Sequence, residues 1–168
     1  MKTPVPILLL LFALWMTCCS STDDSIDPNI GMEKEEMQET TEGVAQVTDV
    51  SVSGEENQYT FSVTISSPDL GCRQYADWWE IIDLDGNLIY RRILAHSHVN
   101  EQPFTRSGAS IDIDSETVIY IRAHMNTTSY GSKVFKGSIS AGFIAAQLDS
   151  EFAEGLTELN PLPDKCAF

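Results

Sequence analysis

One short segment concentrates side chains that are able to bind a metal ion. It reads His96-Ser97-His98-Val99-Asn100-Glu101, and a third histidine, His124, follows next to Met125. Residues two apart in a strand point to one face, so His96 and His98 can chelate a single ion. Imidazoles with a carboxylate suit zinc, whereas imidazoles with a thioether suit copper. The pattern therefore raises the hypothesis of a zinc or copper site at His96, His98, Glu101 and His124.

Two expected strands, residues 87–98 and 117–125, must position these histidines. Alternation along the first strand puts Arg92 on the same face as both of its histidines. Alternation along the second puts Arg122 with its histidine and leaves Met125 on the core side, which disfavours copper. A third strand between these two adds a glutamate and one tryptophan. We predict that one outer sheet face displays Arg92, Arg122, Glu80, His96, His98, His124 and either Trp78 or Trp79.

Two other interpretations of this face remain open. An Arg/His/Trp face also suits a small-molecule ligand, a glycan or a protein partner, and an arginine–glutamate ladder across strands has a purely structural role. The formal net charge of −15 argues against nucleic acid as the partner. The sequence holds no phosphate loop, nucleophile elbow or Cys–His catalytic pattern. We therefore favour a non-enzymatic binding module, with a metal-binding protein as the alternative.

The first 19 residues have the pattern of an export signal. Lys2 supplies a positive charge, and residues 7–15 (ILLLLFALW) form an apolar run. The run has the length of a secretory signal and is too short to cross a bilayer core of roughly 30 Å. We therefore exclude residues 1–19 from the folded domain.

Residues 16–21 (MTCCSS) resemble the lipobox of bacterial lipoproteins, in which a cysteine is lipidated and becomes the new N-terminus. Cys19 is preferred over Cys18, because it places Met16 rather than Trp15 three residues upstream. The resemblance implies a protein anchored by lipid in the inner or outer membrane of the cell envelope, facing the periplasm or the exterior. An ordinary signal peptide and an uncleaved anchor are the alternatives.

The remainder of the chain divides into an acidic linker and a domain. Residues 20–43 hold eight acidic residues and Lys34 as the one basic residue. Such a stretch buries too little apolar area to fold, so we predict a disordered tether. Residues 44–168 form the predicted domain. Its two cysteines, Cys72 and Cys166, are expected to form a disulfide in an oxidising compartment, with free thiols or a metal site as alternatives.

The domain reads as an all-β protein. Short β-type runs alternate with turn signals from residue 44 onward, and Asp85-Gly86 is a strong hairpin signal. About seven strands in roughly 100 residues are typical of an antiparallel β-sandwich. The expected strands cover residues 44–53, 59–65, 76–83, 87–98, 110–113, 117–125 and 133–140. One short helix is expected within residues 148–158.

One part of this pattern resembles fibronectin type III and immunoglobulin-like domains. Residues 118–126 (VIYIRAHMN) and the following Ser-Tyr-Gly-Ser resemble the sixth strand and next turn of that fold. The resemblance implies a core tryptophan on the third strand, at Trp78 or Trp79, and it implies no activity. The chain also resembles uncharacterised secreted bacterial proteins that carry YADWWE, HSHVNEQPF and RAHM segments.

Overall fold

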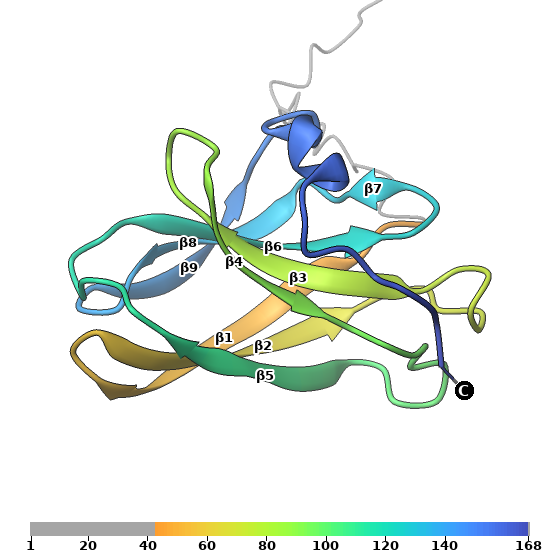
Figure 1. The fold of residues 1–168 in the computed structure, drawn as a ribbon, viewed down its shortest axis with the longest axis horizontal. Coiled ribbons are helices and arrows are strands. Elements are labelled where there is room, and N and C mark those ends of the chain that lie inside the picture. Colours follow the sequence, from red (N-terminus) through yellow and green to blue (C-terminus); the bar gives the residue numbers. More distant parts are fainter. Residues whose placement is uncertain (1–42, 168) are drawn as a thin grey trace, which may run out of the picture. The chain divides into compact units, whose positions relative to one another are not determined.

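The strands expected from the sequence form two antiparallel sheets that pack face to face (Figure 1). The computed structural model describes residues 43–167, and the predicted export signal and most of the acidic linker lie outside them. One sheet has three strands in the order β1-β2-β5, namely β1 (Gln46–Glu55), β2 (Gln58–Ser66) and β5 (Phe104–Ile111). The other has the order β4-β3-β6-β8-β9, with β7 paired to β6. The prediction of an all-β sandwich is confirmed.

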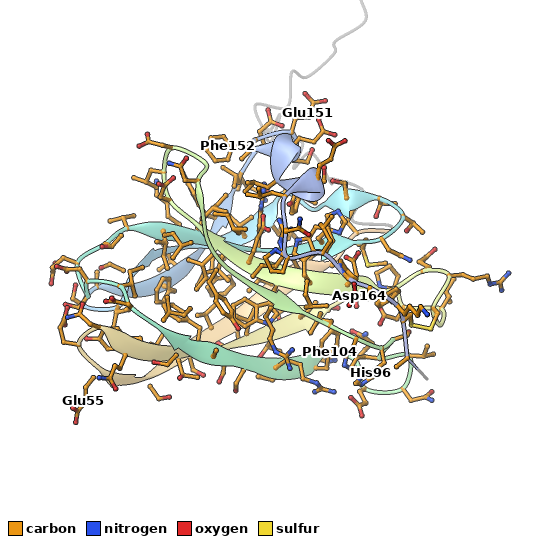
Figure 2. The ribbon with its side chains drawn as sticks, in the orientation of Figure 1. Glu55, His96, Phe104, Glu151, Phe152 and Asp164 are labelled. Atoms are coloured by element: carbon orange, nitrogen blue, oxygen red, sulfur yellow. A yellow bond between two sulfur atoms is a disulfide. The ribbon has the colours of Figure 1, made fainter. Side chains whose placement is uncertain are left out.

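The larger sheet has six strands, and the predicted third strand lies next to one of its edge strands. The six strands are β3 (Ala76–Ile82), β4 (Leu88–Ile93), β6 (Ile119–Met125), β7 (Ser129–Tyr130), β8 (Lys133–Ser138) and β9 (Gly142–Gln147). β3 lies between β4 and β6, as the sequence predicted. The β1–β2 hairpin, with Glu55, and the loop that carries His96 lie at opposite ends of the sandwich (Figure 2). We call the end with His96 the loop end.

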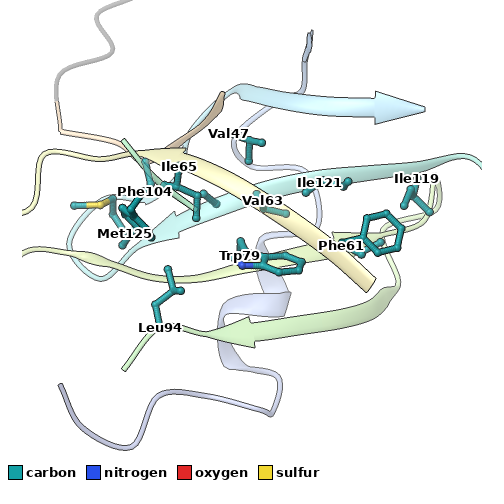
Figure 3. Packing of buried hydrophobic residues seen from close by; sticks show 14 of the residues in the cluster. Val47, Phe61, Val63, Ile65, Trp79, Leu94, Phe104, Ile119, Ile121 and Met125 are labelled. Carbon is teal, nitrogen blue, oxygen red and sulfur yellow. The ribbon is translucent and has the colours of Figure 1, made fainter. Parts of the chain in front are cut away.

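The core lies between the two sheets (Figure 3). Strict alternation along β2 buries Phe61, Val63 and Ile65 completely. On the facing sheet, Trp79 from β3 and Ile121 from β6 are equally buried, so Trp79 takes the core position that the resemblance implied. Fully burying one such side chain contributes roughly 1.5–3 kcal/mol, and this cluster is therefore the main source of stability.

Five elements differ from the sequence predictions, and two of them, β7 and β9, were not expected at all. β5 covers Phe104–Ile111 instead of 110–113, because its serines and glycine carry little β signal. Its Gly108 is needed where the strand passes close to the core, since a Cβ there would lie 2.9 Å from Tyr90 and 3.0 Å from Trp79. β4 ends at Ile93, so the histidines that follow lie in a loop. The expected helix is reduced to a 3-10 turn at Glu154–Glu158.

After β9 the chain turns back and crosses the outer face of the six-stranded sheet (Figure 1). We call residues 148–167 the C-terminal segment. A disulfide joins Cys166, near its end, to Cys72 in the β2–β3 loop, as expected from the sequence. The backbone N–H of Ala167 also donates to the carbonyl of Ala95 at 2.5 Å, in a parallel bridge between Ala167 and His96. The C-terminal segment is thus fixed to the loop end.

Candidate functional site

A buried ion-pair triad occupies the outer face of the six-stranded sheet. Glu80 on β3 is fully buried and pairs in register with Arg91 on β4 and Arg122 on β6. Arg91 donates to Oε2 of Glu80 through Nε at 2.8 Å and Nη2 at 2.6 Å, while Nε of Arg122 donates to Oε1 at 2.8 Å. Both carboxylate oxygens are therefore satisfied by charge-assisted hydrogen bonds.

The remaining guanidinium N–H groups bind the backbone of the C-terminal segment. Arg91 donates to the carbonyls of Leu156 at 2.7 Å, Leu159 at 2.6 Å and Pro161 at 3.1 Å. Arg122 donates to the carbonyls of Phe152 at 2.6 Å and Ala153 at 3.3 Å. The triad therefore joins three strands and holds the C-terminal segment over them.

Aromatic rings complete the burial of this face. The guanidinium carbon of Arg91 lies 4.4 Å from the ring centroid of Trp78, and that of Arg122 lies 3.4 Å from Tyr130. His124 stacks on Trp78 with centroids 3.6 Å apart, and its Nδ1 lies 2.6 Å from a carboxylate oxygen of Asp77. Burial also raises the pKa of Tyr130, which keeps its phenol neutral.

This face is buried, whereas the sequence predicted that it is exposed. Glu80, Arg122 and His124 do share it, but each is at most 7% exposed. The C-terminal segment contacts Arg122, and the rings of Trp78 and Tyr130 pack on His124. Arg92 does not belong to it. Its Nε donates to the carbonyl of Ser107 on β5 at 3.1 Å, so Arg91 takes the place predicted for Arg92. Among residues 43–167, the Glu80 carboxylate has both of its oxygens paired, whereas Nε1 of Trp78 and the hydroxyl of Tyr130 are buried without a hydrogen-bond partner.

The predicted four-residue metal site is not formed. His96 and His98 follow β4 in the loop, whereas His124 is on β6, stacked on Trp78. Glu101 pairs instead with Arg106, at 2.8 Å. Within the described part of the chain, no three histidine, cysteine or acidic side chains are grouped so that they could hold a metal ion. The physical reason is that β4 ends before the histidines, which removes the alternation on which the prediction depended.

Replacing Glu80 by glutamine tests the triad. We expect E80Q to lower the free energy of unfolding by about 3–5 kcal/mol, because two buried guanidinium groups lose their counter-charge. Urea unfolding followed by tryptophan fluorescence measures this loss. The matched control is E101Q, which removes the carboxylate of the solvent-exposed pair with Arg106 and is expected to leave the midpoint nearly unchanged. Equal effects of the two variants would contradict the central role of Glu80.

A second group of polar residues lies at the loop end, around a pocket of about 300 Å³. The β2–β3 loop, the loop after β4 and the C-terminal segment each form part of its wall. Two exposed apolar side chains stand close by, namely Val99 in the wall itself and Leu70, which precedes Gly71 of the wall. The lining residues are Gly71, Cys72, His96, Ser97, His98, Val99, Asn100, Glu101 and Ala167.

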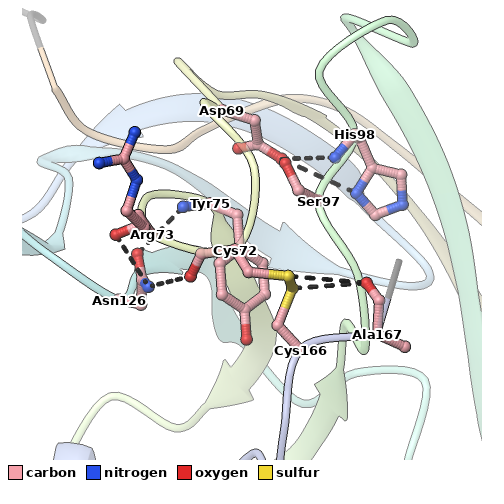
Figure 4. Close-up of a disulfide and its surroundings, with 9 residues drawn as sticks. All are labelled: Asp69, Cys72, Arg73, Tyr75, Ser97, His98, Asn126, Cys166 and Ala167. Carbon is pink, nitrogen blue, oxygen red and sulfur yellow. Dashed lines mark hydrogen bonds and ion pairs between the residues drawn. A yellow bond between two sulfur atoms is a disulfide. The ribbon is translucent and has the colours of Figure 1, made fainter.

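Asp69 organises the loop beside this pocket (Figure 4). This carboxylate, 5% exposed, accepts hydrogen bonds from the hydroxyls of Ser67 and Ser97 and from two backbone N–H groups, those of Ala76 and His98. Four donors from both loops therefore compensate its charge. Asp69 could not be predicted from the sequence, because a loop aspartate after a proline carries no signal for contacts with residues so distant in the chain.

His98 is the one lining side chain that is both titratable and buried. It is 2% exposed and stacks on Phe104 with ring centroids 3.7 Å apart. Its Nδ1 lies 4.0 Å from Asp69, and neither ring nitrogen has a hydrogen-bond partner within residues 43–167. Burial, together with the positive charge of Arg106, lowers the pKa of His98 to about 4. The imidazole is therefore neutral at physiological pH.

The lowered pKa of His98 predicts an acid-sensitive fold. The unfolded chain binds this proton below a pKa near 6.5, whereas the folded chain binds it only near 4. The stabilising contribution is present above pH 6.5 and is lost as the pH falls toward 4. Between pH 7 and pH 5, we expect a loss of roughly 2 kcal/mol. Urea unfolding at these two pH values measures it.

The control for this prediction is H98F, which retains the aromatic stack on Phe104 but cannot be protonated. We expect the difference in unfolding free energy between pH 7 and pH 5 to shrink in H98F by the amount assigned to His98. An unchanged pH dependence in H98F would contradict the assignment.

Comparison with known proteins gives one informative similarity. The chain is 35% identical over 99 residues to a protein of Halomicrobium mukohataei named "Putative lipoprotein". The match covers 58% of this chain and 49% of the relative, so the chain spans about half of the length of the protein it matches. No protein-family description matches the chain, and no solved structure matches it. The implied relation to fibronectin type III and immunoglobulin-like domains therefore extends to the sandwich architecture alone.

Within residues 43–167, no helix has the length and apolar character that crossing a membrane requires.

Proposed function

We propose that this chain is a lipid-anchored protein of the cell envelope and that its β-sandwich is a non-enzymatic binding module. The export pattern, the cysteine pair at Cys18 and Cys19 and the name of the similar protein support the anchor. The disulfide between Cys72 and Cys166 agrees with an oxidising location outside the cytoplasm.

One observation supports binding at the loop end over binding at the sheet face. On the sheet face, the donors of Arg91 and Arg122 are used by Glu80 and by the C-terminal segment. At the loop end, a pocket is lined by a buried histidine whose ring nitrogens have no partner among the described residues. Nε1 of Trp78 and the hydroxyl of Tyr130 on the sheet face also lack partners among the described residues, but the C-terminal segment crosses that face, whereas the loop end has a pocket. Binding residues are frequent on loops held by a rigid scaffold.

The lipid anchor is tested by replacing each candidate cysteine. We expect C19S to lose incorporation of a labelled fatty acid and to leave the membrane fraction, because the acyl acceptor is absent. C18S is the matched control and is expected to remain labelled and membrane-bound. Labelling of C19S with loss in C18S would assign the lipid to Cys18, and absence of labelling in the wild-type protein would contradict the anchor.

Binding at the loop end is tested by photo-crosslinking in intact cells. A photoreactive residue at Val99, which is 48% exposed in the pocket wall, is expected to form an adduct with an envelope component. The same residue at Glu55, at the opposite end of the sandwich (Figure 2), is the control and is expected to form none. Equal adducts at both positions, or none at Val99, would contradict a binding module that acts through this end.

A further inference from the structure

The pocket at the loop end restricts the chemistry of what it can bind, and this inference rests on the proposed function. The charged side chains nearest to the pocket already have hydrogen-bond partners. Asp69 accepts four hydrogen bonds, and Glu101 accepts from Arg106 at 2.8 Å. A charged ligand would therefore enter the pocket without a free counter-charge, which is costly in a partly desolvated site. An uncharged, polar ligand fits better.

His98 indicates which polar group the ligand must carry. Its Nδ1 faces the carboxylate of Asp69 at 4.0 Å, as Figure 4 shows, and we assign the ring proton to that nitrogen. Nε2, on the other side of the ring, then carries a lone pair and is an acceptor. A hydroxyl or amide N–H of the ligand can supply the missing donor.

His96 is the side chain that would have to move. Its ring is exposed, lies 4.5 Å from that of His98 with a tilt of 39°, and forms no hydrogen bond within residues 43–167. An exposed side chain without a hydrogen bond changes rotamer readily. Rotation of the His96 ring away from His98 needs no change in the backbone.

The surroundings favour a sugar over a peptide. A peptide that adds as a strand needs a free backbone edge, but Ala167 already occupies the edge at Ala95 and His96. The pocket instead offers hydroxyl, amide and carboxylate side chains, from Ser97, Asn100 and Glu101. The exposed Val99 beside them can pack against the C–H face of a sugar ring. A volume of about 300 Å³ lies at the lower limit of ligand pockets and suits one sugar residue.

We propose that the loop-end pocket binds one uncharged sugar residue of a glycan, with a sugar hydroxyl donating to Nε2 of His98. Asn100 and Glu101 orient the sugar through its other hydroxyls. Val99 supplies the apolar contact, and the disulfide between Cys72 and Cys166 holds the wall of the pocket in place.

The test uses the full chain in a detergent without a sugar headgroup, with the imidazole nitrogens observed by NMR. The neutral probes are the methyl glycosides of glucose, galactose, mannose and N-acetylglucosamine. We expect at least one of them to shift the Nε2 resonance of His98 in a saturable manner. Glucuronic acid, glucosamine and N-acetylalanine methylamide are expected to bind at least about tenfold more weakly, since they represent an anion, a cation and a peptide.

Two variants connect this binding to the pocket. H98F, checked for folding by near-ultraviolet circular dichroism, is expected to lose about fivefold to tenfold in affinity for the active glycoside, the size of one hydrogen bond. E55Q, at the opposite end of the sandwich, is expected to bind like the wild-type protein. The NMR titration of the wild-type protein does not depend on either variant.

Three results would overturn the proposal. They are no saturable shift at His98 with any neutral glycoside, tighter binding of the methylamide than of the glycosides, and equal affinity in H98F. If they occur while Val99 still crosslinks in cells, the sugar is excluded and the binding module stands. If the Val99 crosslink also fails, the binding module itself is excluded.

Discussion

The burial of Glu80 is the constraint on which the outer half of the structure depends. A buried carboxylate requires compensating positive charge, and Arg91 and Arg122 supply it. Two cations against one anion leave guanidinium N–H groups that need acceptors, and the carbonyls of the C-terminal segment provide these. The C-terminal segment is therefore a structural part of the sandwich, because its removal would take the carbonyl acceptors from both guanidinium groups and expose the triad to water.

The sequence predicted the fold well wherever one face of a strand is buried and the other is polar. The alternation in β6 correctly assigned Ile121 to the core and Arg122 to the opposite face. The same reasoning failed for β4, where Arg91 rather than Arg92 meets Glu80. Both faces of β4 are covered, one by the facing sheet and one by the C-terminal segment. In a strand that is covered on both faces, the alternation of polar and apolar residues does not show which side chains face the core. An error of one residue then assigns every side chain to the opposite face.

The pocket residues were predictable as residue types but not as a site. The spacing of His96 and His98 indicated a possible chelating pair. Their actual position depends on where β4 ends and on contacts from other loops. His98 is held by Asp69, which is distant in the chain, and by Phe104, the first residue of a strand that the sequence did not reveal. Such contacts follow from the loop conformations, and periodicity carries no information about them.

The Glu80 triad and His98 are both buried, but only the triad has its hydrogen-bond partners among the described residues. The C-terminal segment connects these two parts of the domain. The triad around Glu80 is fully satisfied and fixes residues 152–161 on the sheet. Further along, Cys166 and Ala167 attach the same segment to the loop end, where Ala167 forms part of the pocket wall. The shape of the pocket thus depends on the triad through one continuous segment. The triad holds this wall in place, and His98 beside it has no hydrogen-bond partner among residues 43–167. The proposed binding site rests on this combination of a fixed wall and an unpaired imidazole.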